Sequence, residues 1–344
     1  MAPITLDRTR SDLVASALGV LTVGGLYADG WAHLNIGGLE TFFTPWHAVL
    51  YGNFMLLVAW IGWSIWRRHP AGGGRSGAIP EGYGLGVIGI ALFALGGLLD
   101  MAWHMVLGIE VGIEALVSPT HLVLLVGAAL LLSSPVRSSW ATRPTSEWHS
   151  WAVVLGVASV AALAAFFLSY LSVFTEPQST LPLTQIPEGA PGHKTAELAT
   201  VAGLGGYLIT TLLLALPVDY LRRGGRLPAG AVLVIVTAVA VPTAALNEFA
   251  YGWPLVGALI AAAVVDATAR NAGRRLLVPL LTGAVWLGQL AGVAVMGELR
   301  WPVELWAGVV VLSTLLALAM SYINRGPITE PHPSHDGAKR FQTT

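Results

Sequence analysis

The stretch GLGVIGIALFALGGLLDMAWHMVL, residues 84–107, decides the fold class. It is apolar almost throughout, and it is long enough for a helix that crosses a bilayer core, which takes about 20 residues. Its ionisable side chains, Asp100 and His104, stand four residues apart near its end. A charge placed within a bilayer costs about 2.5–3.5 kcal/mol on insertion scales. The stretch therefore predicts a membrane helix whose carboxylate has a compensating partner, either a metal ion or a proton.

The rest of the composition agrees with a membrane protein. The chain is 55% hydrophobic and 11% charged, its mean hydropathy is +0.68, and soluble domains carry about 25% charged residues. We expect an all-α, polytopic integral membrane helical bundle of about ten transmembrane helices, arranged as repeated hairpins. The expected spans are residues 12–32, 46–66, 84–107, 117–135, 149–174, 196–218, 229–250, 253–269, 276–297 and 303–323.

Three regions follow from these spans. Residues 1–135 form a four-helix module that carries the metal-ligand motifs, and residues 136–324 supply six further transmembrane helices whose role is unassigned. Residues 325–344 form a polar cytoplasmic tail. We expect the lipid bilayer as a partner and no nucleic acid.

Lysine and arginine predict the orientation, because cytoplasmic loops of membrane proteins carry an excess of both. With ten spans, all but Lys194 and Arg300 of the 18 basic residues fall on one side. We therefore expect a plasma-membrane protein with both termini in the cytoplasm and the ligand loops on the outer side. In the cytoplasmic halves of the spans the acids noted are Asp219 and Asp266.

A pattern of metal-ligand residues occurs twice. The first copy is DGWAH, residues 29–33, followed by TPWH, residues 44–47, and the second is DMAWH, residues 100–104, followed by SPTH, residues 118–121. Two imidazoles and a carboxylate are typical of a transition-metal site, and the absence of cysteine excludes thiolate ligands. The candidate metal ligands are Asp29, His33, His47, Asp100, His104 and His121.

The spacing within each copy suits this chemistry. An Asp and a His four residues apart share one helix face, and the negative end of the helix dipole there favours a cation. A Ser or Thr cap followed by Pro starts the next helix, which places the second His in its first turn. We expect both sites in one layer beside a small apolar pocket. Each would keep an open coordination position, because it has three protein ligands.

Further polar residues are candidates for a supporting role as hydrogen-bond acceptors or proton carriers next to the ligands. Weaker copies of the pattern occur as PGH at residues 191–193 and NEFAY at residues 247–251, where Asn and Tyr replace Asp and His. The supporting candidates are Glu40, Glu110, Glu114, His193, Asn247 and Glu248.

The motif resembles a known family. DGWAH, followed by ETFFTPWH at residues 40–47 and then Tyr51, resembles the copper-binding stretch of the C subunit of particulate methane monooxygenase and ammonia monooxygenase. That family has a second ligand set, Asn-x3-His and then Pro-x-His, which Asp100, His104 and His121 follow in order. Here Asp100 replaces the family's Asn and the gap to His121 is longer. The resemblance covers about residues 12–135.

The resemblance implies one or two copper ions, with iron or zinc equally compatible with the ligand types. It also implies a small apolar substrate or ammonia, oxidised with dioxygen. The family's A and B subunits are absent from this chain, so partner subunits or a homo-oligomer are expected. Three functions remain open: a copper-dependent membrane monooxygenase or a subunit of one, a metal or proton transporter, and a non-catalytic protein that holds copper or assists assembly. No catalytic residue is assigned.

Overall fold

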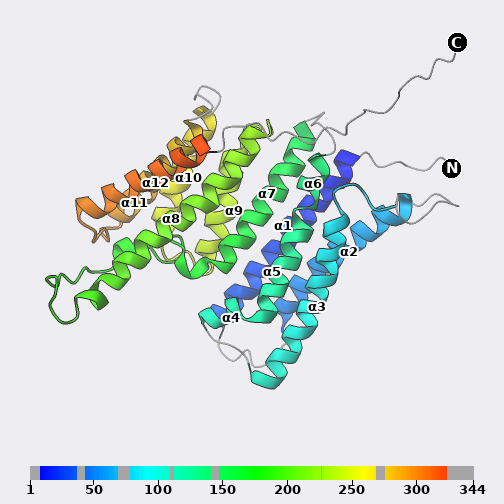
Figure 1. Cartoon of the computed structure of the whole chain (residues 1–344), viewed down its shortest axis with the longest axis horizontal. Helices are drawn as coiled ribbons and strands as arrows, with labels where there is room; N and C mark the ends of the chain where they lie inside the picture. Colours follow the sequence, from blue (N-terminus) through cyan, green and yellow to red (C-terminus); the bar gives the residue numbers. More distant parts are fainter. Residues whose placement is uncertain are drawn as a thin grey trace, which may run out of the picture.

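The protein is an all-α bundle (Figure 1). The computed structural model describes residues 8–36, 43–68, 78–108, 112–140, 147–225, 227–268 and 276–323, and no strand occurs in these ranges. The helices are α1 Arg8–Asn35, α2 Pro45–Arg68, α3 Gly84–Leu107, α4 Ile113–Val117, α5 Pro119–Leu132, α6 Ser134–Trp140, α7 Glu147–Phe167, α8 His193–Arg223, α9 Ala231–Ala245, α10 Gly252–Thr268, α11 Leu277–Val295 and α12 Val303–Ile323, with 3-10 turns η2 Ser169–Leu171 and η3 Gln178–Thr180.

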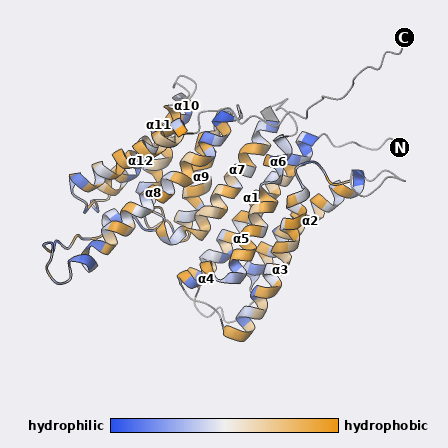
Figure 2. Cartoon of the chain, viewed as in Figure 1, coloured by the Kyte–Doolittle hydropathy of each residue, from blue (hydrophilic) through white to orange (hydrophobic). Residues whose placement is uncertain are grey.

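The prediction of a helical membrane bundle is confirmed. Among the described helices, eight are long and apolar enough to cross a membrane, with α5 and α6 counted together as Pro119–Trp140. The spans expected at residues 229–250 and 253–269 correspond to the shorter apolar helices α9 and α10. Apolar residues follow the helix bodies and polar residues gather towards the ends, as Figure 2 shows. Helix α1 begins and α12 ends at the same end of the bundle in Figure 1.

The motif-bearing helices form two hairpins, as expected: α1 packs against α2, and α3 packs against α5. Glycine permits the close approach in the second hairpin. A Cβ added at Gly89 would lie 2.6 Å from the Gly127 carbonyl oxygen, and one at Gly127 would lie 2.6 Å from the Phe93 nitrogen. Small residues at such contacts let helix backbones meet, as in many membrane proteins. This contact sets α3 beside α5 along their length.

Helix α7 belongs to both halves of the molecule. One face packs with α1 in the core of the first hairpins through Ala162, Leu163 and Phe166, and another joins the core built from α8 to α12. The Tyr27 hydroxyl of α1 donates a hydrogen bond to the Ala162 carbonyl over 3.0 Å. The four-helix module therefore packs against α7, a helix that belongs to the region of residues 136–324.

A buried carboxylate lies at the opposite end of α1 from the ligand motif. Asp12 Oδ1 accepts a hydrogen bond from the Tyr83 hydroxyl over 2.7 Å, and Oδ2 accepts one from Ser138 over 2.8 Å. Arg8 in turn donates to the Ser138 hydroxyl. Burial, together with the neighbouring carboxylate, raises the pKa of Tyr83, which keeps this hydroxyl a donor.

The sequence reasoning on acids in the cytoplasmic halves overlooked Asp12. The two acids that it noted are satisfied locally. Asp219 pairs with Arg222 and Arg223 one turn away. Asp266 accepts hydrogen bonds from the backbone N–H groups of Gly230 and Val232, at the start of α9.

Candidate metal centres

The described residues contain two groups of three that can hold a metal ion, and they are the two predicted sets. We call them the Asp29 triad (Asp29, His33 and His47) and the Asp100 triad (Asp100, His104 and His121). Within each triad, one ligand atom from every residue lies within 4.8 Å of the others. The structure therefore brings together, set by set, all six residues that the sequence singled out.

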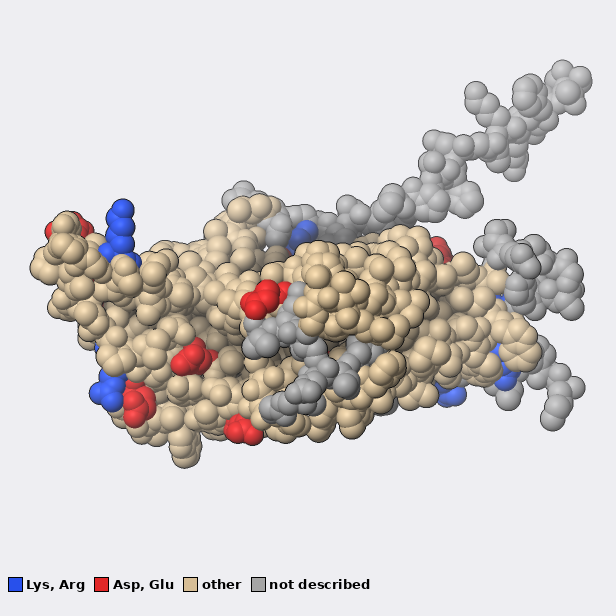
Figure 3. Space-filling model, turned by 90° about the horizontal axis from the view of Figure 1, so that it is seen from below, with Lys and Arg blue, Asp and Glu red and all other residues tan. Residues whose placement is uncertain are grey.

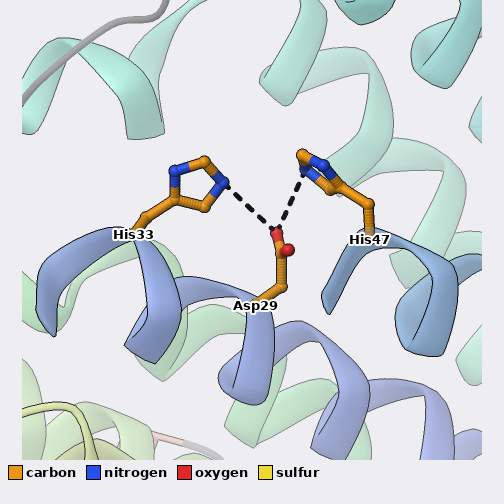
Figure 4. Close-up of side chains that lie close together, drawn as sticks. All are labelled: Asp29, His33 and His47. Carbon is orange, nitrogen blue, oxygen red and sulfur yellow. Dashed lines mark ion pairs between the residues drawn. The ribbon is translucent and has the colours of Figure 1, made fainter. Parts of the chain in front are cut away.

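The Asp29 triad joins the last turns of α1 to the first turn of α2 (Figure 4). Asp29 Oδ2 lies 3.3 Å from His47 Nε2 and 3.9 Å from His33 Nε2. The two imidazole rings are 5.4 Å apart between centroids. Three donors from two helices thus converge on one point, with Asp29 at its base.

The Asp100 triad repeats this arrangement between α3 and α5. Asp100 Oδ2 lies 3.4 Å from His104 Nε2, and Oδ1 lies 3.4 Å from His121 Nδ1. The triads differ in the nitrogen that the second imidazole turns towards the carboxylate, which is Nε2 in His47 and Nδ1 in His121.

Helix capping places the second imidazole of each triad, as the sequence predicted. Thr44 Oγ1 accepts a hydrogen bond from the His47 backbone N–H over 3.1 Å. Ser118 Oγ accepts the corresponding bond from His121 over 3.5 Å. In both copies Pro follows the cap, where its missing N–H costs no helical hydrogen bond. The Ser/Thr-Pro-x-His pattern therefore fixes where the ring leaves the helix.

The donor sets fit a transition metal. Nitrogen and oxygen ligands bind zinc-like ions at about 2.0–2.2 Å, so donors around a tetrahedral ion lie about 3.3 Å apart. The contact of Asp29 with His47, at 3.3 Å, and both contacts of Asp100, at 3.4 Å, match that spacing, whereas the contact of Asp29 with His33 is longer, at 3.9 Å. Asp29 Oδ1 is also buried without a hydrogen-bond partner among the described residues. Because an unpaired buried carboxylate oxygen is costly, this atom points to a missing cation or proton.

The two triads differ in the groups that support them. Thr120 donates a hydrogen bond to Asp100 Oδ1 over 2.9 Å. Ser118 Oγ lies 2.8 Å from His121 Nδ1, and His104 Nδ1 lies 3.3 Å from the Gly108 carbonyl oxygen. In the Asp29 triad, Trp46 stands where the second copy has Thr120.

Trp46 cannot replace the hydroxyl of Thr120. Its ring packs edge to face on Trp31, with the centroids 5.6 Å apart. The indole has an N–H donor, but Asp29 Oδ1 keeps no hydrogen-bond partner in the described part of the chain. The two copies therefore differ at the position of Thr120 and Trp46. Both oxygens of the Asp100 carboxylate have a polar contact, whereas Oδ1 of Asp29 has no hydrogen-bond partner among the described residues.

Both triads open on the same cavity, whose volume is about 890 Å³. Its walls are mainly apolar and aromatic, and the aromatic side chains come from α2, α3, α7 and the following turn: Tyr51, Phe93, Phe166, Phe167 and Tyr170. The triads thus lie at one end of the bundle, as the sequence predicted. Figure 3 views the molecule from below Figure 1 and shows scattered acidic and basic side chains on a mostly uncharged face.

The supporting candidates are not brought to the cavity in the part of the chain that the structure describes. Glu114 lies on α4, and its neighbours in sequence, rather than its own side chain, line the cavity. His193 begins α8, with Nδ1 2.7 Å from the Ile186 carbonyl oxygen. Glu40 and Glu110 lie outside the described residues.

The fourth, degraded copy of the motif lies behind the cavity wall. Asn247 donates a hydrogen bond to the carbonyl of Thr175, a cavity-lining residue, over 3.0 Å. Glu248 is exposed, in the turn after α9, with a positive φ of 51°. Asn247 therefore orders a wall segment, whereas Glu248 is exposed and is not among the residues that line the cavity.

Sequence reasoning missed several contributors to the site. Thr120 could have been found by aligning the two copies, because the second copy has a hydroxyl side chain at the position where the first copy has the indole of Trp46. Tyr51 was quoted in the motif without a role, although it lines the cavity. Phe166 and Phe167 carry no local signal, since their place at the site depends on how α7 packs against α1.

Comparison with known proteins finds no matching family model, no matching curated protein and no matching solved structure. The resemblance to the monooxygenase C subunit therefore rests on the motif residues alone.

Proposed function

We propose that the protein is a copper-binding membrane protein related in chemistry to the copper-dependent membrane monooxygenases. In this proposal it holds one or two copper ions in the Asp29 and Asp100 triads and oxidises a small apolar substrate or ammonia with dioxygen. The observation that carries the proposal is the shared cavity. Two triads of imidazole and carboxylate donors face one largely apolar chamber of about 890 Å³, a size typical of small-molecule sites.

Copper is the preferred ion for two reasons. The motif resembles a copper-binding stretch, and nitrogen and oxygen donors bind Cu²⁺ more tightly than the other divalent first-row ions. Iron and zinc accept the same donors, so elemental analysis has to decide between them. When bound, copper would supply redox activation of dioxygen.

The chain's own residues would position the reactants. The aromatic walls from α2, α3 and α7 exclude water and favour an apolar guest. The carboxylates of Asp29 and Asp100 hold the imidazoles in place and offer sites for protons within the cavity. Tyr51 lies on the wall with its ring 6.3 Å from that of His47.

The chemistry requires a source of electrons. Insertion of one oxygen atom into a C–H or N–H bond with reduction of the other to water consumes two electrons and two protons. An external reductant is therefore needed, delivered by partner subunits or by the membrane. We further propose a plasma-membrane location with both termini in the cytoplasm and the triads on the outer side, from the distribution of basic residues.

A metal or proton transporter is the second candidate, and Asp12 favours it. A buried carboxylate at each end of α1 is an arrangement that a transported proton or cation can use. Both Asp12 oxygens are, however, already engaged by Tyr83 and Ser138. The oxygenase-like proposal accounts for the apolar cavity, which transport of an ion does not require. A non-catalytic copper-holding protein would use the same donors.

Two measurements on the purified, copper-loaded chain separate these functions. The first follows dioxygen consumption with a chemical reductant, with and without a small hydrocarbon or ammonia, and assays the hydroxylated product. The second measures metal-ion or proton flux into vesicles that contain the protein. Substrate-dependent product supports the oxygenase, and flux lost in Asp12→Ala supports the transporter. Retained copper with neither activity supports the holding protein.

A further inference from the structure

The two triads share a pattern but not a hydrogen-bond environment. In the Asp100 triad, Thr120 occupies Oδ1 of the carboxylate, and this leaves Oδ2 facing His104 Nε2 over 3.4 Å. In the Asp29 triad, Oδ2 faces both imidazoles and Oδ1 has no hydrogen-bond partner among the described residues. The Asp100 carboxylate is thus held in orientation by Thr120, whereas the Asp29 carboxylate contacts only its prospective fellow ligands among the described residues.

The imidazoles of the Asp100 triad are also held from behind. The Gly108 carbonyl lies 3.3 Å from His104 Nδ1, a contact that favours a proton on Nδ1 and leaves Nε2 free for a metal. Ser118 Oγ lies between His121 Nδ1, at 2.8 Å, and Thr120 Oγ1, at 3.2 Å. Ser118 and Thr120 thereby connect His121 to Asp100 in one network, in which a metal at Nδ1 would take the place of the Ser118 contact.

Burial points the same way for the carboxylates. The Asp100 side chain is 3% exposed and that of Asp29 is 10% exposed. The exposed fractions of the first imidazoles show the same order, with 9% for His104 and 31% for His33. The second imidazoles show the opposite order, with 12% for His47 and 25% for His121. Water and ions reach the Asp29 carboxylate more easily than the Asp100 carboxylate.

From this asymmetry we propose that the two centres have different tasks. The Asp100 triad is a tight site that fills first and keeps its ion, and the Asp29 triad is a weaker site that exchanges its ion and leaves Asp29 Oδ1 to an incoming molecule. Thr120 is the positioning residue that makes the difference. The inference rests on the proposed function, because it assumes that both triads bind metal. Supporting hydrogen bonds around a metal site are worth about 10–100-fold in affinity, which sets the size of the effect.

The test uses the full chain in detergent micelles, stripped with a chelator and titrated with cobalt(II) alone, whose visible absorption reports its coordination. We expect two steps whose dissociation constants differ at least tenfold. His33→Ala should keep the tight step, and His104→Ala should keep the weak one. Thr120→Val should weaken the tight step by about 10–100-fold and leave the weak step unchanged, and Thr120→Ser, which retains the hydroxyl, should restore it.

Thr22→Val is the matched control. Thr22 lines the same cavity, but its hydroxyl bonds to the Leu18 carbonyl over 2.9 Å and to neither triad, so this variant should titrate like the parent. Two equal steps, or a tight step that survives His104→Ala in place of His33→Ala, would overturn the inference and leave the proposed function intact. Absence of binding by the parent would overturn both. If Thr120→Val does not fold, the comparison of His33→Ala with His104→Ala decides the order.

Discussion

Gly30 of α1 lies against the ring of Phe166 in α7: a Cβ added at Gly30 would lie 2.4 Å from Phe166 Cε2. Gly30 follows Asp29 directly, so this contact ties the first metal ligand to a helix that joins both halves of the bundle. The position of Asp29 therefore depends on a residue far away in the sequence.

Gly30→Ala should disturb the Asp29 triad through this contact. The added methyl group has no room unless the buried Phe166 ring moves, and overpacking of this kind costs about 1–3 kcal/mol. We expect a lower melting temperature and a weaker Asp29 site, measured by thermal unfolding and metal titration. Gly24→Ala on the same helix is the control, because a Cβ there meets no atom within 4 Å. Equal behaviour of the two variants would contradict the role of the contact.

Metal content should fall one site at a time. In the purified protein, His33→Ala and His104→Ala should each lose the share of their own triad, because each substitution leaves only two of the three candidate ligands. Elemental analysis by mass spectrometry measures this. His193→Ala serves as the control, since its imidazole contacts the Ile186 carbonyl instead of a triad. Unchanged metal in both triad variants would refute the assignment of the ligands.

Asp12→Ala should destabilise the bundle and leave the metal in place. The substitution removes the acceptor of two hydrogen bonds, from Tyr83 and Ser138, and hydrogen bonds to a charged group are worth about 1.5–3 kcal/mol each. Asp12→Asn keeps one acceptor and one donor and should cost less. Thermal unfolding together with metal analysis tests this. A loss of metal in Asp12→Ala at temperatures where the protein stays folded would show that this end of α1 communicates with the triads.

Reporter fusions should place the basic loops in the cytoplasm. We expect fusions after Arg75, Arg143 and Arg226 all to give the cytoplasmic signal, because the positive-inside rule places those loops there. A fusion after Gly189, in the segment before α8, should give the opposite signal. A fusion after any of the three arginines that reads as external would mean that a span has been miscounted.

The sequence alone determined the chemistry of the triads and the kind of fold. Composition and apolar runs such as residues 84–107 are enough to predict membrane helices, because a bilayer leaves few other ways to satisfy the backbone. The spacings Asp-x3-His and Pro-x-His predict which side chains share a helix face or a first turn, since these depend only on local helix geometry. For the same reason the caps at Thr44 and Ser118 were predictable.

Only the tertiary structure decided how the triads relate to each other and to the rest of the chain. The shared cavity requires α1 to approach α7 at Gly30 and α3 to approach α5 at Gly89, contacts between residues distant in sequence. The unpaired Oδ1 of Asp29 likewise appears only when the side chains are placed, because hydrogen bonding depends on distances of a few ångströms that no spacing encodes. Local pattern selects the ligands, and long-range packing sets what each ligand can do.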